Sequence, residues 1–199
     1  MSYDLFENIE YQNLENLFNI CKKDSNFIDG VRIEYLKKNQ FFLESLNFLI
    51  DINLINITKN SVSILSKPNI DFSSCLFTNL SKNTEYALFL KNYLSNFINQ
   101  NSSFSFKPNP LYNNLTSDLR NFLISSNKIT YENEEYSIID NELLDLFKNK
   151  EFSPEQLQKV LENKNKIGLE AEELVAKYET GKIKNFNRNL EIDHVALRD

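Results

Sequence analysis

The chain has 199 residues, of which 41% are hydrophobic, so it can form the core of one large domain or of two to three small ones. Its 22 basic and 28 acidic residues give a net charge of −6, which disfavours a general nucleic-acid coat protein because phosphate neutralisation supplies most non-specific affinity. Cys21 and Cys75 lack CxxC spacing and there is one histidine, so neither a disulfide framework nor a zinc site is expected.

The sequence also limits the compartment and the cofactors that we expect. No apolar run reaches the length that spans a bilayer, and residues Met1 to Asp4 have neither the basic region nor the hydrophobic stretch of an export signal. A cytoplasmic protein with no membrane partner is therefore expected. The three glycines, Gly30, Gly168 and Gly181, cannot form a Gly-rich phosphate loop, so we expect no nucleotide or other cofactor.

Residues 1–66 predict a first winged-helix domain. Apolar residues at helical spacing predict helices at about residues 11–23, 28–36 and 40–51. Alternation in twos then predicts strands at residues 54–57 and 62–65 around the turn Lys59-Asn60-Ser61. Three helices and a hairpin make a winged-helix domain, a variant of the helix-turn-helix class. The third helix is expected to bury Leu43, Leu46, Phe48, Leu49 and Ile50.

A second stretch repeats the first. Asn47-Phe48-Leu49-Ile50 returns 74 positions later as Asn121-Phe122-Leu123-Ile124, and the match runs on without a gap through the hairpin. Asn53 meets Asn127, Ile55 meets Ile129 and Ile64 meets Ile138. Each copy has the pattern of a helix end, a polar step, a strand, a turn and a second strand. One structural unit is therefore used twice.

The second winged-helix domain is expected at residues 83–140, after a packed connector at residues 67–82. We predict a helix at about residues 83–100, a short strand at 104–106, a helix at about 111–125 and a hairpin with strands at 129–131 and 136–139. The pattern predicts that the middle helix of this copy is shortened. The overall class is mainly α with small β-hairpins, an α+β fold of tandem winged-helix domains, a C-terminal helical segment and the start of an α/β domain.

Residues 141–166 predict a helical linker. Ser153-Pro154-Glu155-Gln156 is a helix start, because serine can cap, proline suits the first turn and Gln156 completes a capping box. This helix is expected to end at Asn163, before a polar joint at residues 163–166. A further helix is expected from Leu169 to about Thr180, ended by Gly181, and a strand at residues 190–196.

The last 35 or so residues carry short motifs: Ile167-Gly168, Ala171-Glu172-Glu173-Leu174-Val175, Tyr178-Glu179 and Ile192-Asp193-His194-Val195. They resemble the opening helix and first strand of the domain named after the C-terminal part of the plant protein NO VEIN, a restriction-endonuclease-like relative in many bacterial defence and restriction proteins. The resemblance implies that residues 167–199 begin such a domain.

That family continues with a Gly-Tyr-Asp segment and a Glu-x-Lys strand, which together would hold a metal ion and activate water. The sequence ends at Asp199, before either segment, and we expect a continuation beyond it. Glu172 is the only match to a possible active-site residue, and Ala171 stands where the family usually has glycine. Because Glu172 alone cannot hold a catalytic metal, no catalytic residue and no metal ligand is assigned.

The paired winged helices are then the candidate binding elements. In this class the third helix enters the major groove of DNA and the wing touches the backbone or the minor groove. Lysines would meet phosphates, while asparagine and glutamine would read base edges. The candidate DNA-binding residues are Lys37, Lys38, Asn39, Gln40, Asn47, Lys59 and Asn60 in the first copy and Arg120, beside Asn113, Asn114, Thr116 and Ser117, in the second. The second wing is acidic, with Glu132, Glu134 and Glu135, and would repel phosphate.

The sequence leaves three functions open. In the first, the chain is a DNA-binding or DNA-sensing module of a bacterial anti-phage defence or restriction-type protein. In the second, it is a protein-protein adaptor or dimerisation module of a defence complex. In the third, it is the N-terminal part of a metal-dependent nuclease whose catalytic motif lies beyond residue 199. If five lysines formed one basic face, the first function would be favoured over the second. These lysines are Lys22, Lys23, Lys37, Lys38 and Lys59.

Overall fold

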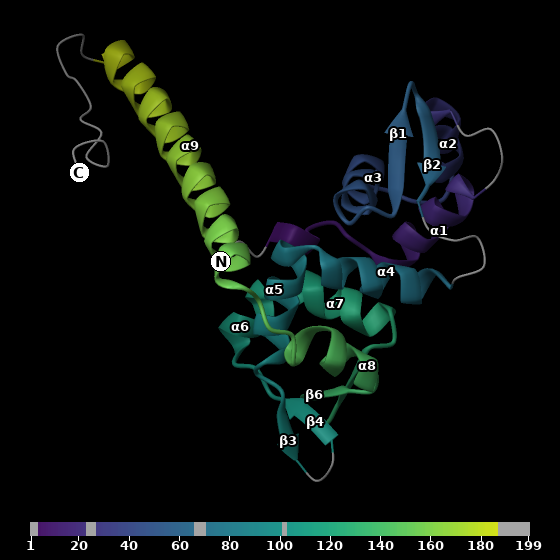
Figure 1. Ribbon diagram of the computed structural model, residues 1–199. Helices are drawn as coiled ribbons and strands as arrows, with labels where there is room; N and C mark the ends of the chain where they lie inside the picture. Colours follow the sequence, from purple (N-terminus) through teal and green to yellow (C-terminus); the bar gives the residue numbers. More distant parts are fainter. Residues whose placement is uncertain (1–3, 23–26, 66–70, 101–102, 187–199) are drawn as a thin grey trace. The chain divides into compact units, whose positions relative to one another are not determined.

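The structure, a computed structural model, describes residues 4–22, 27–65, 71–100 and 103–186. The chain forms two compact units, Met1–Glu151 and Phe152–Asp199. Helices dominate and the strands form small antiparallel sheets, which confirms the predicted mainly α, α+β class (Figure 1). Within the described ranges, no helix has both the length and the apolar character that crossing a membrane requires.

The first half of unit Met1–Glu151 has the predicted element order. After a short 3-10 turn, η1 (Asp4–Phe6), come α1 (Tyr11–Cys21), α2 (Ile28–Leu36), α3 (Phe42–Asp51) and the hairpin of β1 (Ile55–Thr58) and β2 (Ser61–Ile64). The core side of α3 contains Leu46, Phe48 and Leu49 as predicted. The prediction for Leu43 was wrong, because this side chain is 61% exposed on the opposite face of the helix.

A single β-bridge completes the sheet of this half. Phe27, directly before α2, pairs antiparallel with Ser61 of β2, and the Ile28 amide donates to the Asn60 carbonyl at 2.9 Å. Phe27 therefore takes the place of a first strand, and the order of elements is helix, bridge, helix, helix, hairpin.

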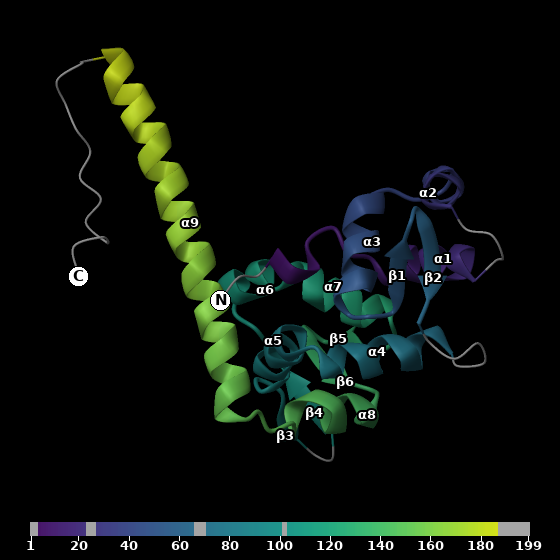
Figure 2. The same ribbon diagram turned by 45° about the horizontal axis from the view of Figure 1, so that its top comes forward.

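The second half has the same order with a fuller sheet. It consists of α5 (Thr84–Leu94), β3 (Ile98–Gln100), β4 (Ser103–Phe106), α6 (Pro110–Leu115), α7 (Ser117–Ser125), β5 (Ile129–Glu132) and β6 (Glu135–Ile138). The strand order is β3-β4-β6-β5, in which β4 pairs with β6 as Phe27 pairs with β2. Figures 1 and 2 show α1, α2 and α3 around the first hairpin, and α5, α6 and α7 with the larger sheet.

Two helix boundaries in this half differ from the prediction. The helix expected to reach residue 100 ends at Leu94, because the Asn96 amide group donates to the carbonyl of Tyr93 at 2.9 Å and satisfies an acceptor of the last turn. The helix expected at 111–125 is divided at Thr116, whose hydroxyl donates to the Tyr112 carbonyl at 2.8 Å.

The two repeats share their backbone hydrogen bonds. Asn53 and Asn127 end α3 and α7 in the left-handed conformation, with φ of 55° and 56°. In each copy the backbone amide of the following residue donates to the carbonyl five residues earlier: Leu54 to Leu49 and Lys128 to Leu123, both at 2.9 Å. These matched helix ends are Schellman-type caps. They give the backbone the same path from the helix into the hairpin in both copies.

The connector predicted at residues 67–82 contains helix α4 (Phe72–Lys82), which begins with the Asp71 carboxylate accepting from the Ser74 amide at 3.1 Å. Its buried side chains confirm a packed connector, and they are Phe72, Cys75, Leu76, Phe77 and Leu80. The domains predicted at 1–66 and 83–140 therefore lie in one compact unit with α4.

The C-terminal elements are α8 (Asn141–Leu143), the π-helical turn η2 (Leu144–Lys148) and α9 (Pro154–Phe186). The predicted capping box at the start of α9 is present: the Ser153 amide donates to Gln156 Oε1 at 2.9 Å, and the Gln156 amide donates to Ser153 Oγ at 3.3 Å.

The joint predicted at residues 163–166 and the stop at Gly181 were wrong, because α9 runs through both. Lysine is a good helix former, and a single glycine costs a helix only about 1 kcal/mol. The helix therefore crosses the expected boundary at residue 167, while the strand expected at residues 190–196 lies outside the described residues.

Candidate functional site

The lysines at the entry to α3 are exposed. Lys37 and Lys38 follow α2 directly, and Gln40 precedes α3 with its side chain in solvent. Asn39 is half-buried and bonded within the domain, because its amide group donates to the Tyr35 carbonyl at 3.0 Å and its oxygen accepts from Asn16 at 3.1 Å. Three of these four predicted DNA contacts are therefore available to a partner.

The outward face of α3 is acidic. Asn47 is exposed as predicted, but Glu44 and Asp51 lie on the same helix face, one three residues before it and the other four residues after it, and both are exposed. The Asp51 carboxyl is partly covered although the residue as a whole is exposed, and this partial burial raises its pKa. A helix that entered a DNA groove with this face would bring carboxylates toward phosphates.

The first wing lies away from the lysines at the entry to α3. Its tip, Lys59 and Asn60, is joined to the start of α2 by the hydrogen bond between the Ile28 amide and the Asn60 carbonyl. Lys37 follows the other end of α2, about 13 Å away along a nine-residue helix. The structure therefore separates Lys59 from Lys37 and Lys38.

Of the other two lysines of the predicted basic face, Lys22 is described by the structure. The Lys22 ammonium lies 5.0 Å from the centre of the Phe18 ring, and Lys23 lies outside the described residues.

In the second copy, Arg120 holds the domain together. Its guanidinium Nη1 donates to the Asn113 carbonyl at 2.7 Å and to the Asn113 side-chain oxygen, and it lies 5.7 Å from the centre of the Tyr136 ring. The Tyr136 hydroxyl donates to the same Asn113 oxygen at 3.2 Å. Arg120 thus ties α7 to α6 and β6, and its Nε and Nη2 also donate to the exposed side-chain oxygen of Asn121, at 3.4 and 3.3 Å.

The second wing remains acidic. Lys107 forms an ion pair with Glu134 at 2.7 Å, and this hydrogen bond lowers the pKa of the Glu134 carboxyl and raises that of the Lys107 ammonium. Because both side chains are exposed, the pair contributes little to stability. Glu132 and Glu135 have no such lysine partner among the described ion pairs.

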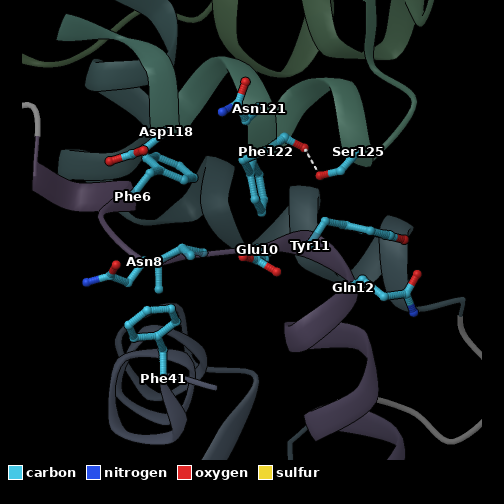
Figure 3. A pocket seen from close by; sticks show the side chains of 11 residues that line it. Phe6, Asn8, Glu10, Tyr11, Gln12, Phe41, Asp118, Asn121, Phe122 and Ser125 are labelled. Atoms are coloured by element: carbon cyan, nitrogen blue, oxygen red, sulfur yellow. Dashed lines mark hydrogen bonds between the residues drawn. The ribbon is translucent and has the colours of Figure 1, made fainter. Parts of the chain in front are cut away.

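A groove lies between the two repeats. It has a volume of about 350 Å³ and is formed by the segment before and at the start of α1, by Phe41 and by the outward face of α7. Figure 3 shows Phe41 pointing toward this segment from one side, with Asp118 and Asn121 on the other. The lining residues are Phe6, Asn8, Ile9, Glu10, Tyr11, Gln12, Phe41, Asp118, Asn121, Phe122 and Ser125.

The groove combines negative charge, amides and aromatic rings. Glu10 and Asp118 are its charged residues, and among the described lining residues there is no lysine or arginine. Asn8, Gln12 and Asn121 supply amide donors and acceptors. Burial raises the pKa of the Tyr11 hydroxyl, whereas a hydrogen bond with Ser73 lowers it; Glu15 and Asp71, which raise it slightly, do not line the groove. Such a site suits a positively charged group that also makes hydrogen bonds.

Phe41 contributes backbone strain at the edge of the groove. This residue has φ 58° and ψ 49°, a left-handed conformation that is rare for a bulky side chain. Its side chain is 38% exposed although it is aromatic. The conformation directs the ring into the groove instead of the core of the first domain (Figure 3).

The groove and the face of α3 are related by the repeat. An offset of 74 positions matches Glu44 with Asp118 and Asn47 with Asn121. Both third helices therefore expose a carboxylate followed three residues later by asparagine. The groove residues come from three separate segments without a motif, so the sequence alone does not mark them as a site. The shared acid and asparagine pair is the one signal of them that the sequence contains.

Comparisons of the chain with protein-family models, with curated proteins and with solved structures found no match. Among the described residues, no group of three or more histidine, cysteine, aspartate or glutamate side chains could hold a metal ion.

Proposed function

We propose that unit Met1–Glu151 is a protein-binding adaptor built from two winged-helix domains, and that its groove binds a partner segment through an arginine or lysine side chain. The observation that carries the proposal is the exposed carboxylate and asparagine pair of the third helices. In the second copy this pair, Asp118 and Asn121, lines a groove together with Glu10.

The groove chemistry supports a basic side chain as the bound group. A guanidinium that reached Asp118 or Glu10 would make charge-assisted hydrogen bonds, which are about twice as strong as neutral ones. Glu10 already accepts a hydrogen bond from the Asn13 amide group at 3.1 Å through one of its two oxygens. The exposed ring of Phe41 offers a face for a cation. The amide of Asn8, the amide oxygen of Gln12 and the amide nitrogen of Asn121 would pair with the backbone of an extended peptide, while the other ends of the Gln12 and Asn121 amides bond Glu15 and Arg120.

DNA docking is the second candidate function. Lys37, Lys38 and Gln40 are exposed at the entry to α3, where a winged helix meets phosphates. The acidic face of α3, the acidic second wing and the net charge of −6 favour a protein partner over DNA.

The place of the adaptor in a bacterial restriction-type defence protein rests on the resemblance of residues 167–199 to the NO VEIN-type domain. Residues 167–179 of that resemblance belong to α9, and residues 192–195 lie outside the described residues. A nuclease reading needs the family's metal-binding segments in addition, and it remains the third proposal.

A peptide panel tests the adaptor proposal. The full chain is incubated with labelled heptapeptide pools that are random except for a central arginine, alanine or glutamate. We expect retention in the order arginine, alanine, glutamate, and loss of the arginine preference in Glu10→Gln/Asp118→Asn. A control, Asp29→Asn/Asp145→Asn, makes the same change in charge at exposed carboxylates that do not line the groove. Equal retention of the three pools would refute the proposal.

Fluorescence anisotropy tests the DNA candidate. A labelled mixed-sequence duplex is titrated with the chain at low and moderate salt, beside Lys37→Glu/Lys38→Glu. Binding that weakens steeply with salt and disappears in the variant would support DNA docking at α3. No binding at low salt would exclude it.

A further inference from the structure

Helix α9 carries an apolar stripe on its exposed surface. The side chains of Leu157, Leu161, Leu174, Val175 and Tyr178 are 37%, 55%, 67%, 61% and 63% exposed. These residues recur at the spacing that brings side chains to one face of a helix. Single exposed apolar residues are ordinary, but a stripe along a helix of 33 residues needs a partner of similar length.

The sequence of α9 has the period of a coiled coil. Positions spaced alternately by three and four residues form a heptad seam with apolar side chains at all but one place. The seam consists of Leu157, Val160, Lys164, Ile167, Ala171, Leu174 and Tyr178. A single lysine in such a seam is a known device for fixing register and the number of strands.

We infer that α9 forms a two-stranded antiparallel coiled coil with α9 of a second copy of this chain. Length identifies the occupant: the other helices of the described ranges contain 11 residues or fewer, whereas the seam of α9 extends over three heptads. A second α9 has the same length and the same period. Among the described helices, α9 alone has both.

The buried area is adequate for a dimer. The free energy of burying an aliphatic side chain, divided by 25 cal/mol per Å², gives a buried area of roughly 60–120 Å² per side chain. The described apolar side chains of the stripe then supply on the order of 500 Å² per helix, or about 1,000 Å² in total, the size that a specific interface needs. These side chains are Leu157, Leu161, Ala171, Leu174, Val175 and Tyr178.

The flanking charges set the direction of the second helix. In a parallel, in-register pair, Lys177 of one helix would face Lys182 of the other on both sides of the seam, and like charges there are unfavourable. Both lysines are exposed, and each also forms an ion pair within α9, Lys177 with Glu173 at 3.8 Å and Lys182 with Glu179 at 3.9 Å, which reduces this repulsion without removing it. An antiparallel pair separates them and also aligns the two helix dipoles favourably.

Sedimentation equilibrium of the full chain tests this inference. The expected mass is twice 23.4 kDa at micromolar concentrations. Leu174→Glu puts a charge into the seam and is expected to weaken association at least a hundredfold. The matched control is Leu169→Glu, which makes the same substitution at a 47% exposed leucine of the opposite helix face and is expected to leave the dimer intact.

Spin labels test the direction. A label at Gln158→Cys, near the start of α9, is expected to lie about 30 Å from its counterpart in an antiparallel pair centred near residue 168, because each residue adds 1.5 Å. A separation below about 20 Å would overturn the antiparallel direction. A monomeric chain at 100 μM, or equal weakening by Leu174→Glu and Leu169→Glu, would overturn the dimer.

Discussion

Phe48 and Phe122 occupy equivalent positions of the two repeats, and their ring centroids lie 6.2 Å apart. Both rings also pack against Phe6 of η1, at 5.6 Å and 4.9 Å. The duplicated helix ends are therefore joined through the same residue of each copy. This contact makes the two domains one unit and fixes the walls of the groove beside it.

Phe48→Ala and Phe122→Ala are each expected to lower the free energy of unfolding by about 3–5 kcal/mol, because both rings are almost fully buried. Since the rings touch, the double variant is expected to lose less than the sum of the two, by about 0.5–3 kcal/mol. Urea unfolding of the four proteins measures this coupling. Phe27→Ala, at a 66% exposed ring, is the control and is expected to change stability by less than about 0.5 kcal/mol.

Asn53 and Asn127 give a direct test of the repeat. Both are exposed and both have positive φ, so alanine at either position is expected to cost about 1–2 kcal/mol through backbone strain alone. Glycine tolerates this conformation, and Asn53→Gly and Asn127→Gly are expected to keep most of the stability. Thermal unfolding of the four variants decides the matter. Different responses at the two sites would show that the caps are not equivalent.

Ser153 and Gln156 cap α9 reciprocally. Ser153→Ala is expected to weaken the start of this helix by about 1 kcal/mol and to speed amide hydrogen exchange at Glu155 and Gln156. Ser153→Thr keeps the hydroxyl and is expected to keep the protection. If both variants exchanged at the same rate, the side-chain cap would have no role.

Stability is expected to fall at alkaline pH. Burial raises the pKa of the Cys21 thiol from its ordinary 9.0 to about 12. The folded chain therefore favours the protonated thiol. Its stabilising contribution is complete below pH 9 and is lost as the pH rises toward 12. Burial also raises the pKa of Tyr86 and Tyr93, which adds to the effect in the same direction.

Urea unfolding at pH 8, 10 and 11 measures this loss, and alkylation at pH 8 gives an independent check. Cys21 is 5% exposed and protonated at that pH, so iodoacetamide is expected to modify it only after unfolding. An unfolding midpoint that is the same at pH 8 and pH 11 would contradict the assignment.

Much of the fold of unit Met1–Glu151 could be predicted from local pattern. The period changes from helix to strand at Asn53 and again at Asn127, and both hairpins lie within a residue or two of the expected positions. The capping box at Ser153 was also predictable, because its two hydrogen bonds join residues three apart.

The remaining differences come from interactions that local pattern does not encode. Leu43 fits the apolar face of α3 by type, but its position places it in solvent. Arg120 is a residue type that commonly contacts DNA, and only the tertiary structure shows that its guanidinium bonds Asn113 and lies near Tyr136. The groove depends on segments that meet only after the two repeats have packed on each other, so no sequence motif marks it.

We propose that the groove between the repeats recognises a basic side chain of a partner protein. The most direct test is an NMR titration of the nitrogen-15-labelled chain with an arginine-centred peptide, because the side-chain amides of Asn8, Gln12 and Asn121 give separate signals in the groove. We predict that these three signals move, and that they stay in place in Glu10→Gln/Asp118→Asn. Changes confined to the signals of Lys37, Lys38 and Gln40, or no change at millimolar peptide, would contradict the claim.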